Sequence, residues 1–167
     1  GPLRGIKRDV YDGGIREPFI AWWPDRVKPG VSRHVSAFQD VTPTLAELAG
    51  TSVPAGIDGI SMAPALLRRG GQRQHDYFYW EYVGGKAGSR QSCLEIATGW
   101  KGVRYGSKGT LELYNMNRDL AEKSDGAKQH PDVVARLTRY LDTVRTPSAI
   151  FPMPERGRKP RREDSDF

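Results

Sequence analysis

The sequence predicts a mixed α/β chain whose second half is a small four-stranded antiparallel sheet with one packed C-terminal helix. Three observations indicate this class. Residues 40–49 carry apolar side chains at helical spacing. Residues 77–115 contain four short runs of strand-forming residues between glycine-bearing turns, and residues 131–144 return to an amphipathic helical pattern. Short successive strands with tight connections favour antiparallel pairing.

The chain begins with a basic loop that carries Lys7 and Arg8 and runs into a Tyr-Asp-Gly-Gly turn at residues 11–14. Two adjacent glycines allow the backbone to reverse tightly and to pass close to a neighbouring segment. A lysine on such a loop can be held near an anion as a compact positive charge. A solvated surface lysine beside an ordinary turn is the alternative interpretation.

Three elements are expected between this loop and the sheet. Residues 19–23 form a continuous apolar run ended by a proline, which predicts a short buried strand. Asp40 is a suitable N-cap for a helix through residue 49, with Pro43 in its first turn and Gly50 as its stop. Residues 62–67 predict a second, short helix.

The sheet and its helix follow. Residues 77–82, 92–98, 100–105 and 111–115 are the four expected strands. Alternate residues of a strand face opposite sides, so about half of the aromatic run at 77–82 should be core. In the last helix Pro131 suits the first position. Its expected buried face consists of Val133, Leu137, Tyr140, Leu141 and Val144.

Composition limits the function classes. The chain has 167 residues, of which 37% are hydrophobic, and no apolar run reaches the roughly 18 residues of a membrane span. The single cysteine, Cys93, excludes an intramolecular disulfide and is expected to be a buried thiol. The net charge of +6 is compatible with a nucleic acid or with a sulfated polyanion. Because no nucleic-acid motif is present, we expect no nucleic-acid partner.

The first eighteen residues resemble a known signature. Residues 1–7 and 11–18 are similar to the pattern G-x-L-R-G-x-K … Y-E-G-G-x-R-x-P of the type I sulfatases, the arylsulfatase-like members of the alkaline-phosphatase superfamily. Ile6 and Asp12 depart from that pattern without affecting the lysine. The resemblance implies that Lys7 is a catalytic, sulfate-binding residue. Arg4 and Arg16 also belong to the signature, and we expect them to make structural ion pairs or hydrogen bonds.

The resemblance continues to about residue 151. Residues 40–50 resemble the family's D-x-x-P-T-L-x-x-L-A-G helix, and residues 58–61 its D-G-x-S loop. Three further family motifs have counterparts here: the W-K strand at 100–101, the E-L-Y-D/N strand at 112–115 and the H-P helix start at 130–131. The family's D-P-x-E is replaced by Asp-Leu-Ala-Glu at 119–122, a departure that concerns local stability more than chemistry.

The implied organisation is the end of an alkaline-phosphatase-like catalytic domain followed by a small subdomain. Residues 1–72 correspond to the C-terminal part of the catalytic domain and residues 73–151 to the antiparallel subdomain with its terminal helix. Residues 152–167 are a basic tail, predicted to be disordered. The isolated chain should therefore expose an apolar surface where the missing sheet packs.

The resemblance also implies chemistry that this segment does not contain. A sulfatase uses a formylglycine, made from Cys or Ser in a C/S-x-P/A-x-R motif, and a calcium ion held by Asp and Asn oxygens. Cys93 lacks the motif's context, and the calcium ligands would lie upstream of residue 1. His34, His75 and His130 show no metal-ligand spacing, so no metal ligand is assigned. Asp9 and Asp12 are interpreted as turn-stabilising side chains rather than an acid–base pair.

Two functions are compatible with these residues. In the first, the parent protein hydrolyses a sulfate ester of a small molecule or glycan, and this segment, inactive alone, supplies Lys7 and packs on the remainder of the catalytic domain. In the second, the segment is a non-catalytic or degenerate sulfatase-like module that binds anionic glycans or a protein partner. The resemblance implies a periplasmic, secreted or lysosomal location, although the sequence carries no address.

Overall fold

A computed structural model describes residues 1–84 and 88–155. The chain divides into two compact units. The sheet unit consists of residues 1–17 together with the chain from Tyr77 onward, and the helical unit consists of residues 18–76. Each unit is described by itself below.

The sheet unit contains the antiparallel sheet that the sequence predicts. Its strands are β1 (Tyr77–Val83), β2 (Ser89–Glu95), β3 (Trp100–Tyr105) and β4 (Glu112–Asn115). They are hydrogen-bonded in the order β1-β2-β3-β4, and each neighbouring pair is antiparallel. The one misplaced strand is β2, which was expected at residues 92–98. Its polar first residues are buried because they lie on a central strand, with neighbours on both edges.

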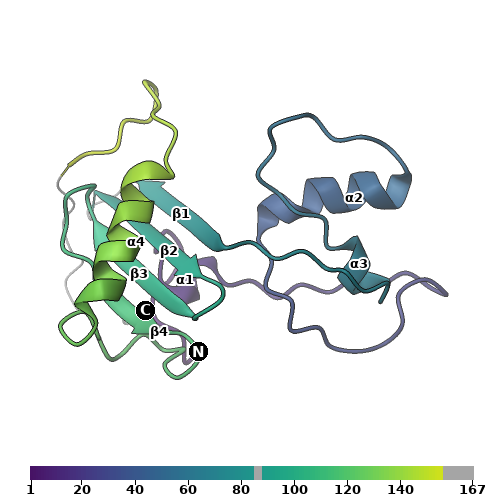
Figure 1. Ribbon diagram of the computed structural model, residues 1–167, viewed down its shortest axis with the longest axis horizontal. Coiled ribbons are helices and arrows are strands. Elements are labelled where there is room, and N and C mark those ends of the chain that lie inside the picture. The colour runs from purple at the N-terminus through teal and green to yellow at the C-terminus, as the bar shows by residue number, and fades with distance from the viewer. Residues whose placement is uncertain (85–87, 156–167) are drawn as a thin grey trace. The chain divides into compact units, whose positions relative to one another are not determined.

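Both faces of the sheet are covered. Helix α4 (Pro131–Thr143) lies across one face (Figure 1). Its Leu137 and Leu141 belong to the same core cluster as Cys93 and Leu113. The N-terminal segment, including the short helix α1 (Asp12–Ile15), covers the other face. There its Tyr11 joins a cluster formed by five other buried residues: Val10, Val103, Tyr105, Tyr114 and Met116. The expected packing of the C-terminal helix on the sheet is confirmed, and the N-terminal segment forms a third layer.

Glu95, at the end of β2, links helix α4 to the sheet. Both of its carboxylate oxygens lie 2.9 Å from the guanidinium of Arg136, and Tyr77 and Thr98 also donate hydrogen bonds to it. The Arg136 hydrogen bonds, assisted by those from Thr98 and Tyr77, lower the pKa of Glu95 to about 2 against the opposing effect of burial. The pair therefore fixes the helix on the strand by charge as well as by apolar contact.

The helical unit contains a 3₁₀ turn, η1 (Phe38–Asp40), followed by α2 (Val41–Ala49) and α3 (Ala63–Leu66). Gly50 ends α2 in the left-handed conformation, with φ 68°, as its position predicted. Asp40 occupies the N-cap position of α2, as expected, but its side chain makes no capping hydrogen bond to the helix. Its carboxylate instead accepts hydrogen bonds from the backbone amides of Ala37 and Ile60 and lies 2.7 Å from His75 Nε2. Asp40 is fully buried, so it ties three segments together at the start of the helix.

The predicted strand at residues 19–23 is not formed in the described part of the chain. A strand needs a hydrogen-bonding neighbour, and a sequence pattern alone does not supply one. Residues 19–23 lie in the helical unit without ladder pairing to any described strand. Its large apolar side chains remain accessible, since Ile20 is 89% exposed and Trp22 85% exposed.

The contacts group the chain differently from the expected domain boundary near residue 72. Residues 1–17 lie with the sheet because they cover one of its faces, although the resemblance assigns them to the catalytic domain. Residues 152–155 of the expected tail are described, and two of them are hydrogen-bonded. The backbone carbonyls of Pro154 and Glu155 accept hydrogen bonds from Ser107 and Lys108. Residues 156–167 of the expected tail lie outside the described residues.

Candidate functional site

The candidate site is the Lys7 loop, defined here as residues 4–9 at the start of the sheet unit. The amide of Asp9 donates to the carbonyl of Ile6 at 2.9 Å and closes a tight turn. Lys7 and Arg8 occupy the two central positions of that turn, and both are exposed. Within residues 1–84 and 88–155, neither side chain has a hydrogen-bond or ion-pair partner. Two cations are therefore presented at one loop tip.

The side chain of Asp9 stabilises this turn. Its Oδ2 accepts the amide of Ile6 at 3.0 Å, and its Oδ1 lies 2.6 Å from the guanidinium of Arg90. Arg90 is 5% exposed and projects from β2. The interpretation of Asp9 as a turn-stabilising residue is therefore confirmed. Its carboxylate is bound on the inner side of the loop, away from an acid–base role.

The paired glycines are required because α1 lies very close to the backbone of the Lys7 loop. A Cβ added to Gly13 would lie 2.2 Å from the carbonyl oxygen of Gly5, and one added to Gly14 would lie 2.4 Å from that of Asp9. The amide of Gly13 also donates to the carbonyl of Arg4 at 2.7 Å. Real side chains cannot occupy such space. The first turn of α1 therefore packs directly on the backbone of the Lys7 loop, as the paired glycines predicted.

Arg4 anchors the beginning of the loop on the sheet. Its guanidinium lies 3.9 Å from the centre of the Tyr11 ring and donates to Tyr114 Oη at 2.7 Å and to the Glu122 carbonyl at 3.0 Å. Tyr11 and Tyr114 both donate to Glu112 Oε2, at 2.6 and 2.7 Å. Burial, with the neighbouring Glu112 carboxylate, raises the pKa of Tyr11, so the phenol stays a donor. The expected structural role of Arg4 is confirmed.

A buried charge cluster anchors α1. The ammonium of Lys101 lies 2.7 Å from Asp12 Oδ1 and 2.8 Å from Glu122 Oε1, and the Asp12 amide donates to Glu122 Oε2 at 2.7 Å. Lys101 and Glu122 are fully buried. Burial raises the pKa of Glu122, against the opposing effect of Lys101. Arg16 completes the cluster from the surface, 3.2 Å from Asp12 Oδ2, which confirms its expected ion pair.

The strand register explains why these anchors meet. Arg90 is paired with Tyr105, Lys101 with Tyr114, and Val103 with Glu112. Paired residues share a face, so the register places one row of polar side chains on the face that the N-terminal segment covers: Arg90, Lys101, Glu112 and Tyr114. Sequence reasoning recognised the W-K and E-L-Y motifs but did not connect them to the lysine loop. The period of two within those motifs was the available signal.

The remaining polar candidates lie elsewhere. His75 is paired with Asp40 in the helical unit, and burial lowers the pKa of His34 nearby. The ring of His130 lies 4.7 Å from that of Trp100. Over the described residues, no group of three or more His, Cys, Asp or Glu side chains is placed to hold a metal ion. No helix in the same residues is long and apolar enough to cross a membrane.

Cys93 is the buried thiol that the sequence predicts. It is fully buried between the sheet and α4 and forms no disulfide. Burial raises its pKa to about 12. A thiol that stays protonated at neutral pH is a poor nucleophile, which agrees with the absence of a sulfatase motif around it.

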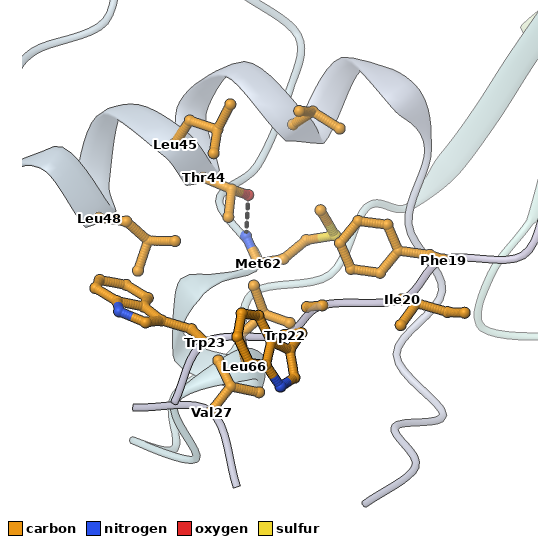
Figure 2. A pocket seen from close by; sticks show the side chains of 12 residues that line it. Phe19, Ile20, Trp22, Trp23, Val27, Thr44, Leu45, Leu48, Met62 and Leu66 are labelled. Carbon is orange, nitrogen blue, oxygen red and sulfur yellow. Dashed lines mark hydrogen bonds between the residues drawn. The ribbon is translucent and has the colours of Figure 1, made fainter. Parts of the chain in front are cut away.

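An apolar cavity of about 350 Å³ lies in the helical unit (Figure 2). Its walls come from residues 19–27, α2 and α3, and Figure 2 shows the Phe19 ring beside Met62 and the Trp23 ring beside Leu48. The exposed fraction alternates along residues 19–23. Phe19 and Trp23 are 58% and 42% exposed, against 89% and 85% for Ile20 and Trp22. One side of this segment therefore faces the helices, and the other faces outward with no cover within the helical unit.

A family model and two curated proteins that resemble this chain all belong to the sulfatases. Residues 6–147 match the family model described as N-sulphoglucosamine sulphohydrolase, C-terminal. Human arylsulfatase A is 43% identical over 84 residues, which cover 49% of this chain and 17% of that protein. N-acetylgalactosamine-6-O-sulfatase of Bacteroides thetaiotaomicron is 32% identical over 163 residues, which cover 87% of this chain and 30% of that protein. The chain thus spans less than a third of these curated relatives.

Solved structures agree in fold. A structure from work on the metabolism of multiple glycosaminoglycans by Bacteroides thetaiotaomicron superposes with a TM-score of 0.69 and 25% identity, covering 86% of this chain and 32% of that one. A 2-O GAG sulfatase gives a TM-score of 0.54 at 30% identity, covering 63% of this chain and 23% of that one.

Proposed function

The chain belongs to the sulfatase family, as the C-terminal portion of a type I sulfatase, and we propose that its parent protein hydrolyses a sulfate ester with Lys7 binding the sulfate group. The observation that carries the proposal is the construction of the Lys7 loop. Its tip is exposed and cationic, whereas Asp9, Arg4 and α1 are held from within by Arg90, Tyr114 and Lys101. The sequence signature at this loop is the one in which the family carries an active-site lysine.

An exposed lysine on an anchored loop suits a sulfate group. The three non-bridging oxygens of a sulfate ester share negative charge, and the transition state of hydrolysis places further charge on the leaving oxygen. A cation that is already in position stabilises that charge without reorganising during the reaction, and one such group contributes roughly 10²- to 10³-fold in rate. Lys7 can supply this contact because no described residue neutralises it, while the inward ion pairs of Asp9 and Asp12 keep both carboxylates occupied.

The nucleophile and the metal belong, in this proposal, to the upstream part of the parent. Calcium prefers several hard oxygen ligands. The described carboxylates of the loop region do not fit that requirement, because Asp9, Asp12 and Glu122 are each bound to a cationic side chain. Formylglycine likewise has no C/S-x-P/A-x-R precursor motif in this segment, and Cys93 is buried behind α4. We therefore assign both groups to residues outside this chain.

The helical unit would join this segment to the remainder of the catalytic domain. Residues 19–23 have a strand-forming sequence but no strand partner among the described residues, and Ile20 and Trp22 expose apolar surface. An unpaired extended segment beside an apolar face is suited to strand addition. We propose that the upstream domain pairs with this segment and covers its outward side. Residues 1–72 then complete the catalytic domain, and residues 73–151 form the subdomain.

The relatives indicate a broad class of substrate. One relative, whose match covers 87% of this chain, is named for a sulfated amino sugar. We propose a sulfated small molecule or glycan as the substrate.

The test is turnover by the full-length protein, expressed with a formylglycine-generating enzyme and assayed with calcium on a generic aryl sulfate. Release of the phenol, with formylglycine detected by mass spectrometry, is the expected result. An inert protein in which formylglycine is present and the protein is folded would contradict the proposal. It would favour the second function, a sulfatase-like module that binds anionic glycans or a partner without turnover.

A further inference from the structure

Arg8 stands in an unusual backbone conformation at the tip of the Lys7 loop. Its φ is 78°, in the left-handed region that favours glycine. The turn that it helps to form is closed by the Asp9–Ile6 hydrogen bond, and its backbone places an arginine where glycine would be unstrained. A bulky residue held in this conformation at a candidate site is an observation from which a role can be inferred.

The surroundings of Arg8 leave its charge free. It is exposed, and in the part of the chain that the structure describes it has no hydrogen-bond or ion-pair partner. The two carboxylates nearest in sequence, Asp9 and Asp12, are turned inward and bound to Arg90 and Lys101. The loop tip therefore carries two adjacent cations, and no carboxylate of residues 1–84 or 88–155 forms an ion pair with either. One sulfate group requires only one of these cations at the reacting centre.

We propose that Arg8 binds a second anionic group of the substrate, so that the enzyme selects sulfate esters that carry another sulfate or a carboxylate nearby. The proposal deepens the proposed function, because Lys7 must hold the reacting sulfate for Arg8 to select its neighbour. A guanidinium suits this task since its planar fork can donate two parallel hydrogen bonds to a carboxylate or sulfate. The substrate class is a polyanionic glycan rather than an isolated aryl sulfate.

The test compares two substrates and four proteins. The full-length enzyme, its Arg8→Gly and Arg8→Lys variants, and an Arg139→Ala control are assayed on 4-nitrophenyl sulfate and on a disulfated disaccharide. Glycine removes the side chain and suits the backbone, so the loop is preserved. Arg139 is also an exposed arginine of the sheet unit, on α4. Thermal unfolding of Arg8→Gly should show no loss of stability.

The expected result is a rise of about tenfold in KM of Arg8→Gly for the disulfated substrate, as for loss of a hydrogen bond to a charged group. The kcat/KM for 4-nitrophenyl sulfate should change less than about twofold, and Arg8→Lys should recover part of the loss. The preference for the disulfated substrate should also weaken as ionic strength rises. An equal loss on both substrates, or no loss on either, overturns the proposal.

A binding measurement separates this proposal from the proposed function. Calorimetry of the disulfated and a monosulfated disaccharide with the same proteins requires no turnover. If the wild type hydrolyses neither substrate but Arg8→Gly selectively weakens binding of the disulfated sugar, hydrolysis fails and the role of Arg8 stands. If the wild type hydrolyses both substrates and Arg8→Gly binds both sugars as the wild type does, the role of Arg8 fails and hydrolysis stands.

Discussion

At the scale of single residues, the Lys7 loop shows how buried charges can position an exposed one. Lys7 has no hydrogen-bond or ion-pair partner among the described residues, and the loop that carries it is held by residues that do not reach the loop tip. Asp9 is the nearest of them, because it binds both the loop amide of Ile6 and the buried guanidinium of Arg90. The position of the loop that carries Lys7 therefore depends on β2 as well as on the loop itself.

Replacing Asp9 should separate this anchoring from ordinary surface electrostatics. Asp9→Ala leaves Arg90 buried without its carboxylate, and breaking a buried pair in this way costs about 3 kcal/mol. The free energy of unfolding of the full-length protein, from urea titration, should fall by that amount. Glu47→Ala is the matched control, since it removes the exposed pair with Arg69, whose closest atoms are 3.7 Å apart. That pair should contribute less than about 1 kcal/mol. Equal effects of the two variants would contradict the anchoring role of Asp9.

At the scale of elements, α1 is too short to be stable alone and is defined by what it packs against. Its two glycines place helical backbone directly on the carbonyls of Gly5 and Asp9. Lys101 on β3 and Glu122, which follows β4 in the chain, hold its first residue in place. The double glycine is thus a packing requirement of the Lys7 loop.

Gly13→Ala should displace α1 from the loop. The added methyl would lie 2.2 Å from the Gly5 carbonyl oxygen, and backbone cannot move away cheaply. We expect a loss of about 3 kcal/mol in the free energy of unfolding. Gly56→Ala is the control, because Gly56 has a φ of +79° but open space around its Cβ position. It should lose only the strain of the left-handed backbone, about 1 kcal/mol. A Gly13→Ala protein as stable as this control would disprove the close approach.

The contact between α4 and the sheet should make stability depend on acidity. The pKa of Glu95 is lowered from an ordinary value near 4.5 to about 2 in the folded chain. Its pairing therefore stabilises the fold fully above the unfolded pKa and less as the pH falls from about 4.5 to 2. In Glu95→Gln, melting temperatures measured over this range should decline less steeply than in the wild type. A parallel decline in the two proteins would show that the Arg136 pair contributes nothing.

Several elements were predictable from local pattern, and the exceptions have physical causes. The four strands and α4 follow from alternation and helical periodicity, and β3 and β4 lie at or within one residue of their predicted bounds. The polar start of β2 was missed because Arg90 and Gln91 look like loop residues. Their partners are Asp9 and Arg104, which are distant in sequence. The strand predicted at 19–23 is not formed, because the segment has no hydrogen-bonding neighbour among the described residues; we propose that this neighbour lies in the upstream part of the parent protein.

The candidate site was predictable only in part. Lys7 was found through a family signature, whereas composition and spacing alone left a solvated lysine as the alternative. The Lys101 cluster was not predicted, since a lysine on a strand is ordinarily expected to be solvated. It is fully buried here because Asp12 and Glu122 both reach it across the fold. Such a three-residue charge cluster is a tertiary property that no local window reveals.

At the scale of the whole molecule, the two units differ in how completely they bury apolar surface. The sheet unit has a core on both faces of its sheet. In the described helical unit, by contrast, Met62 and Ala63 are the buried hydrophobic residues, while Phe19, Ile20, Trp22 and Leu45 are each more than half exposed. This imbalance agrees with a unit that completes its core against another part of the parent protein.

The 167-residue chain alone should therefore bind a hydrophobic dye, and the full-length protein should not. Exposed contiguous apolar surface is what such dyes detect. A double variant, Ile20→Ser with Trp22→Ser, should lower dye fluorescence of the isolated chain. Leu120→Ser should leave it unchanged, because Leu120 is a half-exposed residue of the sheet unit. Monomeric, monodisperse behaviour of the isolated chain without dye binding would contradict the expected interface.

The most direct measurement is the activity of full-length Lys7→Ala on an aryl sulfate, with calcium and the maturation enzyme supplied. Loss of one preorganised cation should reduce kcat/KM roughly 10²- to 10³-fold, with unchanged formylglycine content and melting temperature. Lys28→Ala, which removes another exposed lysine, is the control and should keep its activity. Full activity of a folded Lys7→Ala enzyme would contradict the assignment of Lys7 as the sulfate-binding residue.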